Sequence, residues 1–123
     1  MRFMGATFDP SALYRFTAIQ RTLKENGITT ARVAARVATL QAQLFDGLSG
    51  TALGEAELLN PLDGKPHARF LAFRDPRAQR WCAELDAKGV VTDVRGDVLR
   101  IGFGLYHDEE DVDALTAVVP DLA

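Results

Sequence analysis

The stretch VVTDVRGDVLRIGF at residues 90–103 decides the fold, because it predicts two strands and the turn between them. Residues 90–94 are mostly β-branched, residues 95–97 supply turn formers, and the apolar run resumes at 98–103. Two such runs joined by two or three residues that include glycine are typical of an antiparallel hairpin. The C-terminal half of the chain is therefore expected to be built around a β-hairpin.

Alternation along the second strand predicts one apolar face and one open face, because successive side chains of a strand point to opposite sides. The apolar face carries Leu99, Ile101, Phe103 and Leu105. The other face carries Val98, Arg100, Gly102 and Gly104. Arg100 thus has no large neighbour on its C-terminal side, and a forked guanidinium in open space suits two-point recognition of a carboxylate or phosphate. The alternative is a solvated sheet face on which Arg100 makes a surface ion pair of little energetic value.

Two helices are predicted before the sheet. Asp9-Pro10 is a helix start, and the helix should reach about Asn26, where Gly27 can adopt the left-handed conformation that ends helices. The apolar stripe of this helix consists of Leu13, Phe16, Ile19 and Leu23. A second helix should follow Thr29-Thr30, with Val33, Val37, Leu40 and Leu44 on one side. Residues 1–46 are therefore expected to form an antiparallel helical hairpin and connecting segment.

The remaining elements complete a β-α-β-β-α unit. Residues 47–67 read as a loop region with a short helical turn at 55–59, and residues 68–73 read as a strand. Asp75-Pro76 predicts the start of a third helix that Gly89 ends, and Asp108 predicts the start of a last helix. The expected fold class is α+β, with a small, mainly antiparallel sheet at 68–123 covered by helices. By its length, the chain of residues 1–123 is expected to be a single domain.

Composition excludes several classes of function. The net charge is −3 with scattered basic residues, which argues against nucleic acid as a partner. No apolar run is long enough for a membrane span, and one cysteine, Cys82, fits a cytoplasmic protein. The acidic residues 108–111 suit the start of a helix, so no metal site is predicted. No glycine-rich phosphate-binding motif is present.

Two segments resemble a known family. FRDPRAQRWCAELDAKGVVTDVRGDVLRIGFGLYHDEEDVDAL at 73–115 is similar to the C-terminal small domain of class V-type (fold-type I) aminotransferases that use pyridoxal phosphate (PLP), and most of all to kynureninase-like members. GATFDPSALYRFTAIQRTLKENGI at 5–28 is similar to the segment that leads into that domain. The resemblance covers about half of the chain, in the right order.

The resemblance implies roles for two residues. Arg100, in the LRxGF motif, would bind the α-carboxylate of an amino-acid substrate. Thr7 would approach the cofactor phosphate across a dimer interface, although Gly5-Ala6-Thr7-Phe8 departs from the glycine-threonine-proline order of the family. The implied partners are a large PLP-binding domain or a second subunit, so a homo-oligomer is expected.

The departures from the family indicate an incomplete enzyme. The three lysines, Lys24, Lys65 and Lys88, lie on surface-like segments, so none is expected to form the Schiff base with PLP. We therefore expect no catalytic residue in this chain, no PLP on the isolated chain, and a C-terminal fragment that is inactive alone. The alternative is a free-standing α+β module that binds a small carboxylate at Arg100 or a partner protein through the first helix.

Overall fold

The computed structural model describes residues 9–65 and 68–123. The first helix, α1, spans Ser11–Glu25, and the Asp9 carboxylate accepts a hydrogen bond of 2.9 Å from the backbone N–H of its first residue. The helix ends at Glu25; Gly27, two residues on, has a φ of +61°, and the N–H of Ile28 donates to the carbonyl of Leu23 at 2.8 Å. The end of the helix has the predicted glycine, whereas its start lies one residue later than predicted, with Pro10 rather than Asp9 at the N-cap.

The second helix, α2, spans Thr30–Gly47, and the Thr29 hydroxyl accepts a hydrogen bond from the N–H of Arg32. Its predicted apolar stripe is buried and consists of Val33, Val37, Leu40 and Leu44. Both helices of the predicted hairpin are therefore present. By contrast, α1 buries none of its residues.

The chain divides into two units by its internal contacts, one ending at Val33 and the other running from Ala34 to Ala123. A single domain over 1–123 stays a prediction. Within residues 9–65 and 68–123, no helix combines the length and the apolar character that a membrane span requires.

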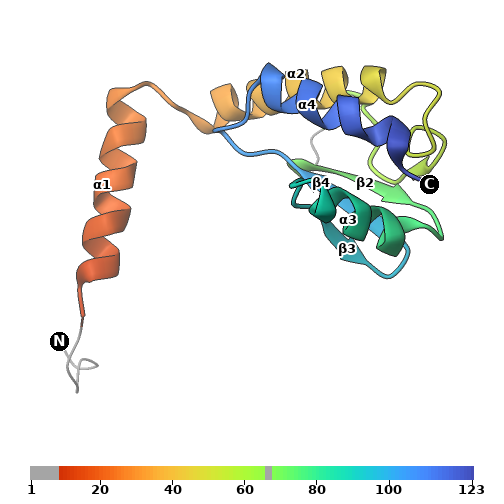
Figure 1. Ribbon diagram of the computed structural model, residues 1–123. Helices are drawn as coiled ribbons and strands as arrows, with labels where there is room; N and C mark the ends of the chain where they lie inside the picture. The colour runs from red at the N-terminus through yellow and green to blue at the C-terminus, as the bar shows by residue number, and fades with distance from the viewer. Residues whose placement is uncertain (1–8, 66–67) are drawn as a thin grey trace. The chain divides into compact units, whose positions relative to one another are not determined.

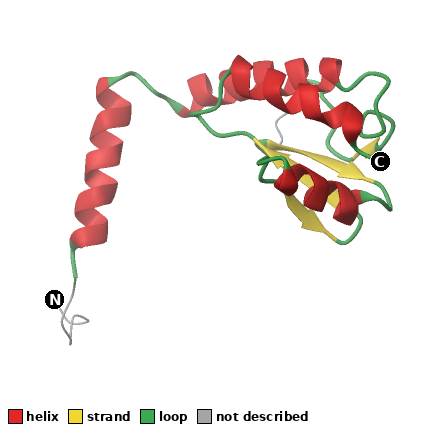
Figure 2. Ribbon diagram, in the orientation of Figure 1, coloured by secondary structure: helices red, strands yellow, loops and turns green. Residues whose placement is uncertain are grey.

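The second unit is built around a four-stranded antiparallel sheet with the strand order β1-β2-β4-β3 (Figure 2). The strands are β1 (Glu57–Leu58), β2 (Phe70–Arg74), β3 (Asp93–Arg95) and β4 (Val98–Gly102). Each neighbouring pair is antiparallel. This arrangement of a small antiparallel sheet with helices confirms the predicted α+β class.

The first strand corrects the prediction of a helical turn at residues 55–59. Glu57 pairs with Arg74 and Leu58 with Phe73 in an antiparallel register. Beyond them, the Asn60 side chain accepts a hydrogen bond from the N–H of Ala72 at 2.9 Å and donates to the carbonyl of Phe70. Pairing with a distant strand therefore overrides the weak local preference of this segment.

The predicted hairpin is confirmed, with a shorter first strand. Arg95 pairs with Val98 across a two-residue turn, and Gly96 at its first position has a φ of +59°. The strand begins at Asp93 rather than at Val90. The reason is that the N–H of Val90 is already engaged as part of the preceding helix end, where it donates to the carbonyl of Leu85.

Two helices follow β2 and β4. Helix α3 spans Ala78–Ala87, and helix α4 spans Glu109–Val118 and continues into the short 3₁₀ helix η1 (Val119–Asp121). Asp108 and Asp111 form a reciprocal capping box at the start of α4. The acidic start of this helix therefore has the structural role that the sequence indicated.

Helices α2 and α4 lie side by side and run in the same direction (Figure 1). Near the start of α4, the Arg36 guanidinium forms a two-point ion pair with the Glu109 carboxylate. Further along, the Gln43 amide donates to the Asp113 carboxylate at 2.8 Å. These polar contacts set the register of the two helices against each other.

The core lies on one face of the sheet, against α2, α3 and α4. Its largest fully buried side chains are Trp81, Phe73, Leu40, Leu44, Leu48, Leu53, Leu71, Leu85, Leu99 and Val119. The predicted apolar face of β4 is correct for Leu99, Ile101 and Phe103, but Leu105 is 50% exposed. Because the strand ends at Gly102, alternation no longer governs the side chain at 105.

The start of α3 yields a prediction about pH. The Asp75 side chain accepts hydrogen bonds of 2.8 Å from both Nε and the backbone N–H of Arg77. The side-chain bond, followed by the backbone bond, lowers the pKa of Asp75 from an ordinary value of 3.8 to about 2. A carboxyl with a depressed pKa in the folded state stabilises the fold above its unfolded pKa and loses that contribution as the pH falls.

We therefore expect Asp75→Asn, which keeps an acceptor for the helix start but loses the charge, to be less stable than the parent by about 1 kcal/mol at pH 7. The difference should shrink between pH 4 and pH 2, as Asp75 is protonated in the parent. Melting temperatures of both proteins across this range are the measurement. A gap that stays constant with pH would contradict a role for the charge.

Candidate functional site

Arg100 lies in the middle of β4 on the sheet face opposite the core. Its side chain is 31% exposed and forms an ion pair through Nη2 with the Asp93 carboxylate. The guanidinium carbon lies 5.5 Å from the centre of the Phe70 ring, close enough for a cation–π contact. The surface ion pair and the open setting, which the sequence left as alternatives, are thus both present.

The donors of Arg100 are only partly used. Within residues 9–65 and 68–123, the guanidinium donates to Asp93 and to no other acceptor. Its Nε atom is buried without a hydrogen-bond partner in this part of the chain. Since a guanidinium has five N–H donors, Arg100 retains donors for an acidic ligand.

Space beside Arg100 is open on one side. A Cβ atom added at Gly102 would meet no atom within 4 Å, as the sequence predicted. At Gly104 the prediction of open space was wrong, because an added Cβ would lie 2.5 Å from the Tyr106 ring. The floor next to Arg100 therefore reaches Gly102 and is closed beyond it by an aromatic side chain.

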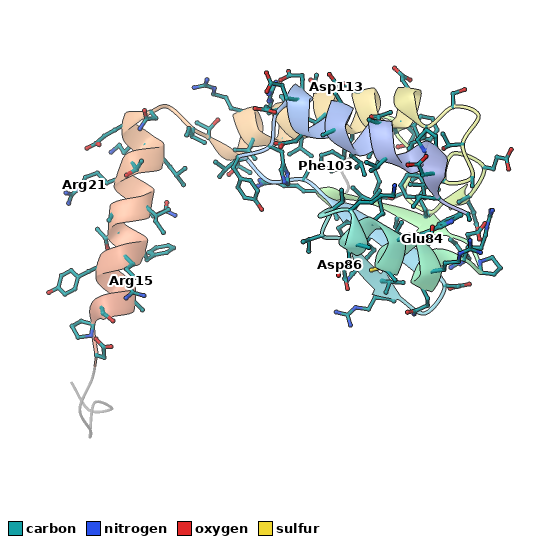
Figure 3. The ribbon with its side chains drawn as sticks, in the orientation of Figure 1. Arg15, Arg21, Glu84, Asp86, Phe103 and Asp113 are labelled. Carbon is teal, nitrogen blue, oxygen red and sulfur yellow. The ribbon has the colours of Figure 1, made fainter. Side chains whose placement is uncertain are left out.

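An open groove of about 640 Å³ adjoins the guanidinium. Its lining includes Phe70 at the start of β2 and Arg69 just before it. Val91 from the segment before β3 and His107 from the segment before α4 also line it. Phe103, labelled in Figure 3, lies just past the end of β4 and also lines the groove. Two arginines at one apolar groove suit an anion that carries an apolar part.

The segment between β4 and α4, which closes one end of the groove, is held by a side-chain hydrogen bond. Nδ1 of His107 accepts the N–H of Gly104 at 2.9 Å, and the Tyr106 and His107 rings meet edge to face at 4.5 Å. These contacts place the Tyr106 ring over Gly104 and so shape the end of the groove.

The acidic residues near His107 form no metal site. Among the described residues, no group of three His, Cys, Asp or Glu side chains could hold a metal ion. Asp108 and Asp111 cap α4, and Glu109 pairs with Arg36. Their carboxylates are therefore engaged in structural contacts.

Comparison with known protein families matches residues 33–119 to the kynureninase C-terminal domain. The chain belongs to this family. A solved structure described as a NifS-like protein is similar to the chain, with a TM-score of 0.62, 21% identity and 74% of this chain covered. This chain spans 28% of that structure's length. A search of curated proteins gave no match.

Residues 33–119 are thus a domain of the kynureninase C-terminal type, and the similar structure shares its fold. The family match confirms the resemblance that the LRxGF motif and the segment around it indicated. The roles of Arg100 and Thr7 stay predictions, and Thr7 lies outside the described residues.

PLP does not fit the described residues of this kynureninase-family domain. A PLP enzyme needs a lysine for the Schiff base, and no lysine lines the groove at Arg100. Lys88 pairs with Asp121 at 2.8 Å and Lys65 with Asp63 at 2.9 Å, while Lys24 lies on α1. None of the three lysines is therefore placed to form a Schiff base in this groove.

The sequence interpretation missed Asp93, although its signal was present. A two-residue turn that pairs Arg95 with Val98 also pairs Asp93 with Arg100. Directly opposed residues of two strands share a face and lie close together. Counting back from the turn would thus have placed the carboxylate beside the guanidinium.

Gly102 offers a test of the groove in this family member. Gly102→Val should place two methyl groups on the floor beside Arg100 and raise the KM of the assembled enzyme for an amino acid by about ten- to a hundredfold. The melting temperature should not fall, because valine suits a strand and the added Cβ meets open space. Gly102→Ala, with a smaller side chain, is the matched control. Equal KM values in all three proteins would show that substrate does not approach this face.

Proposed function

We propose that this chain is the small domain of a kynureninase-like PLP enzyme and that Arg100 binds the α-carboxylate of its amino-acid substrate. The observation that carries the proposal is the guanidinium of Arg100 on an open sheet face, with spare donors and free space at Gly102. A charge-assisted pair of hydrogen bonds to a carboxylate requires this combination.

The groove supports an amino acid rather than a bare anion. Phe70 supplies apolar surface near Arg100, and Arg69 adds a second positive charge. An arginine fork fixes the orientation of a planar carboxylate as well as binding it. In this proposal, the domain holds the carboxylate end of the substrate and so sets the position of its α-carbon.

The reacting groups belong to another part of the enzyme. PLP supplies stabilisation of negative charge at the α-carbon when it is bound, and the described residues of this chain do not hold it. We therefore propose that the chain is inactive alone and acts joined to a large PLP-binding domain. We also place the enzyme in the cytoplasm, because Cys82 is free and leaves no internal disulfide to stabilise the domain.

The test compares two ligands that differ only in the carboxylate. The assembled enzyme is titrated with L-alanine and with ethylamine, before and after Arg100→Lys. We expect the parent to prefer L-alanine by roughly 30-fold or more, and the variant to lose most of that preference, because lysine cannot form the fork. Equal preference in both proteins would overturn the proposal.

Helix α1 supports a partner for the domain. Its apolar stripe is exposed, with Leu13 at 57%, Phe16 at 61% and Ile19 at 57% exposure. Exposed apolar patches of this kind mark interaction surfaces. We propose that the large domain or a second subunit covers this stripe in the assembled enzyme.

Association of the isolated chain checks this part of the proposal. At high micromolar concentration we expect a dimer or larger species by sedimentation velocity, since the stripe has no cover in the described chain. Phe16→Glu should shift the chain to the monomer, and Arg15→Glu, which changes charge on the same helix, should not. A parent protein that stays monomeric would count against the stripe as an interface.

A further inference from the structure

Asp93 is the acceptor that contacts Arg100, and the two residues lie directly opposite each other in the hairpin of β3 and β4. Their side chains therefore share the open face of the sheet. Asp93 is 48% exposed, so the contact stands at the edge of the groove rather than in the core. Nothing in the packing of the core requires a carboxylate at this position.

Charges around Asp93 leave the site attractive to an anion. Nε of Arg95 lies 3.7 Å from the Asp93 carboxylate. Arg95, Asp93 and Arg100 together carry a formal charge of +1. Arg69 adds a further positive charge at the groove. Asp93 thus pairs with Arg100 without cancelling the field that draws a carboxylate in.

The conformation of Arg100 needs a contact to hold it. Its Nε atom is buried and has no acceptor among the described residues. A buried N–H without a hydrogen bond costs free energy, so this cost disfavours the observed side-chain conformation. Turning the side chain outward would expose Nε to solvent. The ion pair with Asp93 and the Phe70 ring are the contacts that oppose that movement.

We infer that Asp93 is a positioning residue, which holds the Arg100 guanidinium in the orientation that receives the substrate carboxylate. The inference rests on the proposed function of Arg100. A free arginine samples many rotamers, and ordering it during binding lowers affinity. Asp93 orders the side chain beforehand through Nη2, which leaves the Nη1 donors unused by the described residues.

The first experiment examines the 123-residue chain itself. Nitrogen-15 NMR at low temperature should give separate Nη signals for Arg100 in the parent, because the ion pair slows rotation of the guanidinium. Asp93→Asn should merge them. The matched control is Asp97→Asn, which removes the same charge from the same hairpin, 3.9 Å from Arg74. Separate Nη signals in all three proteins would overturn the inference.

The second experiment measures kinetics of the assembled enzyme with its amino-acid substrate. Asp93→Asn should raise KM by about tenfold with kcat unchanged, and Asp97→Asn should leave both unchanged. Asp93→Glu should recover part of the loss, since it restores the carboxylate. A lower KM in Asp93→Asn would overturn the inference, because Asp93 would then compete with the substrate.

Arg100→Lys distinguishes the positioning role of Asp93 from the carboxylate-binding role of Arg100. If Arg100→Lys raises KM and Asp93→Asn does not, the positioning role fails and the carboxylate-binding role stands. If Arg100→Lys leaves KM unchanged, the proposed function of Arg100 fails, and with it the role of Asp93.

Discussion

Arg100→Ala is expected to lower kcat/KM of the assembled enzyme for its amino-acid substrate by roughly 30- to 1,000-fold. The substitution removes a charge-assisted pair of hydrogen bonds at a partly desolvated groove, which is worth about 2–4 kcal/mol. Binding of PLP should be retained, because no lysine lines the groove at Arg100 and the Schiff base is therefore formed elsewhere. Steady-state kinetics and the visible absorbance of bound cofactor are the measurements.

Stability should hardly change in the same variant. Asp93, the ion-pair partner of Arg100, is half-exposed, and exposed pairs contribute about 0–1 kcal/mol. Arg74→Ala is the matched control, since Arg74 lies on the same sheet face and pairs with Glu57 instead. If Arg100→Ala unfolds the domain, or if kcat/KM stays within about threefold of the parent, the charge is structural.

Trp81→Ala is expected to give the largest loss of stability, about 3–5 kcal/mol. The side chain is completely buried, its Nε1–H donates to the Ala123 carbonyl at 3.1 Å, and the Arg77 guanidinium lies 4.6 Å from its ring centre. Removing it leaves a cavity between α3 and the sheet, which the surrounding side chains can fill only in part. Because a domain of this size is stabilised by about 5–15 kcal/mol in total, the variant should be close to unfolding.

Urea unfolding followed by circular dichroism measures this loss without relying on tryptophan fluorescence. Trp81→Phe serves as the control, because it keeps most of the apolar contact and loses the hydrogen bond to Ala123. It should lose less stability than Trp81→Ala. A Trp81→Ala protein within 1 kcal/mol of the parent would mean that the core closes around the vacated space.

The sequence by itself determined the features that depend on a few neighbouring residues. Asp9 and Asp75 before proline placed two helix starts to within two residues, and Gly27 and Gly89 placed the corresponding ends with φ values of +61° and +80°. The turn at Gly96 and the alternation along β4 placed Arg100 on the open face. Capping, turn and alternation rules act over one to five residues, so they can be applied before the chain is folded.

The tertiary structure alone decided the features that join distant segments. Strand β1 exists because Glu57 and Leu58 reach Arg74 and Phe73, and no local pattern predicted it. The same holds for the Tyr106 ring over Gly104 and for the groove that Arg69 completes.

Asp93 stands between these cases, because its register followed from the turn while its ion pair with Arg100 depended on side-chain placement. Contacts between distant residues depend on how the whole chain packs, since the free energy of burial is shared among many side chains. Local conformational preferences of a fraction of a kcal/mol are smaller than this free energy of burial and are therefore overridden by it.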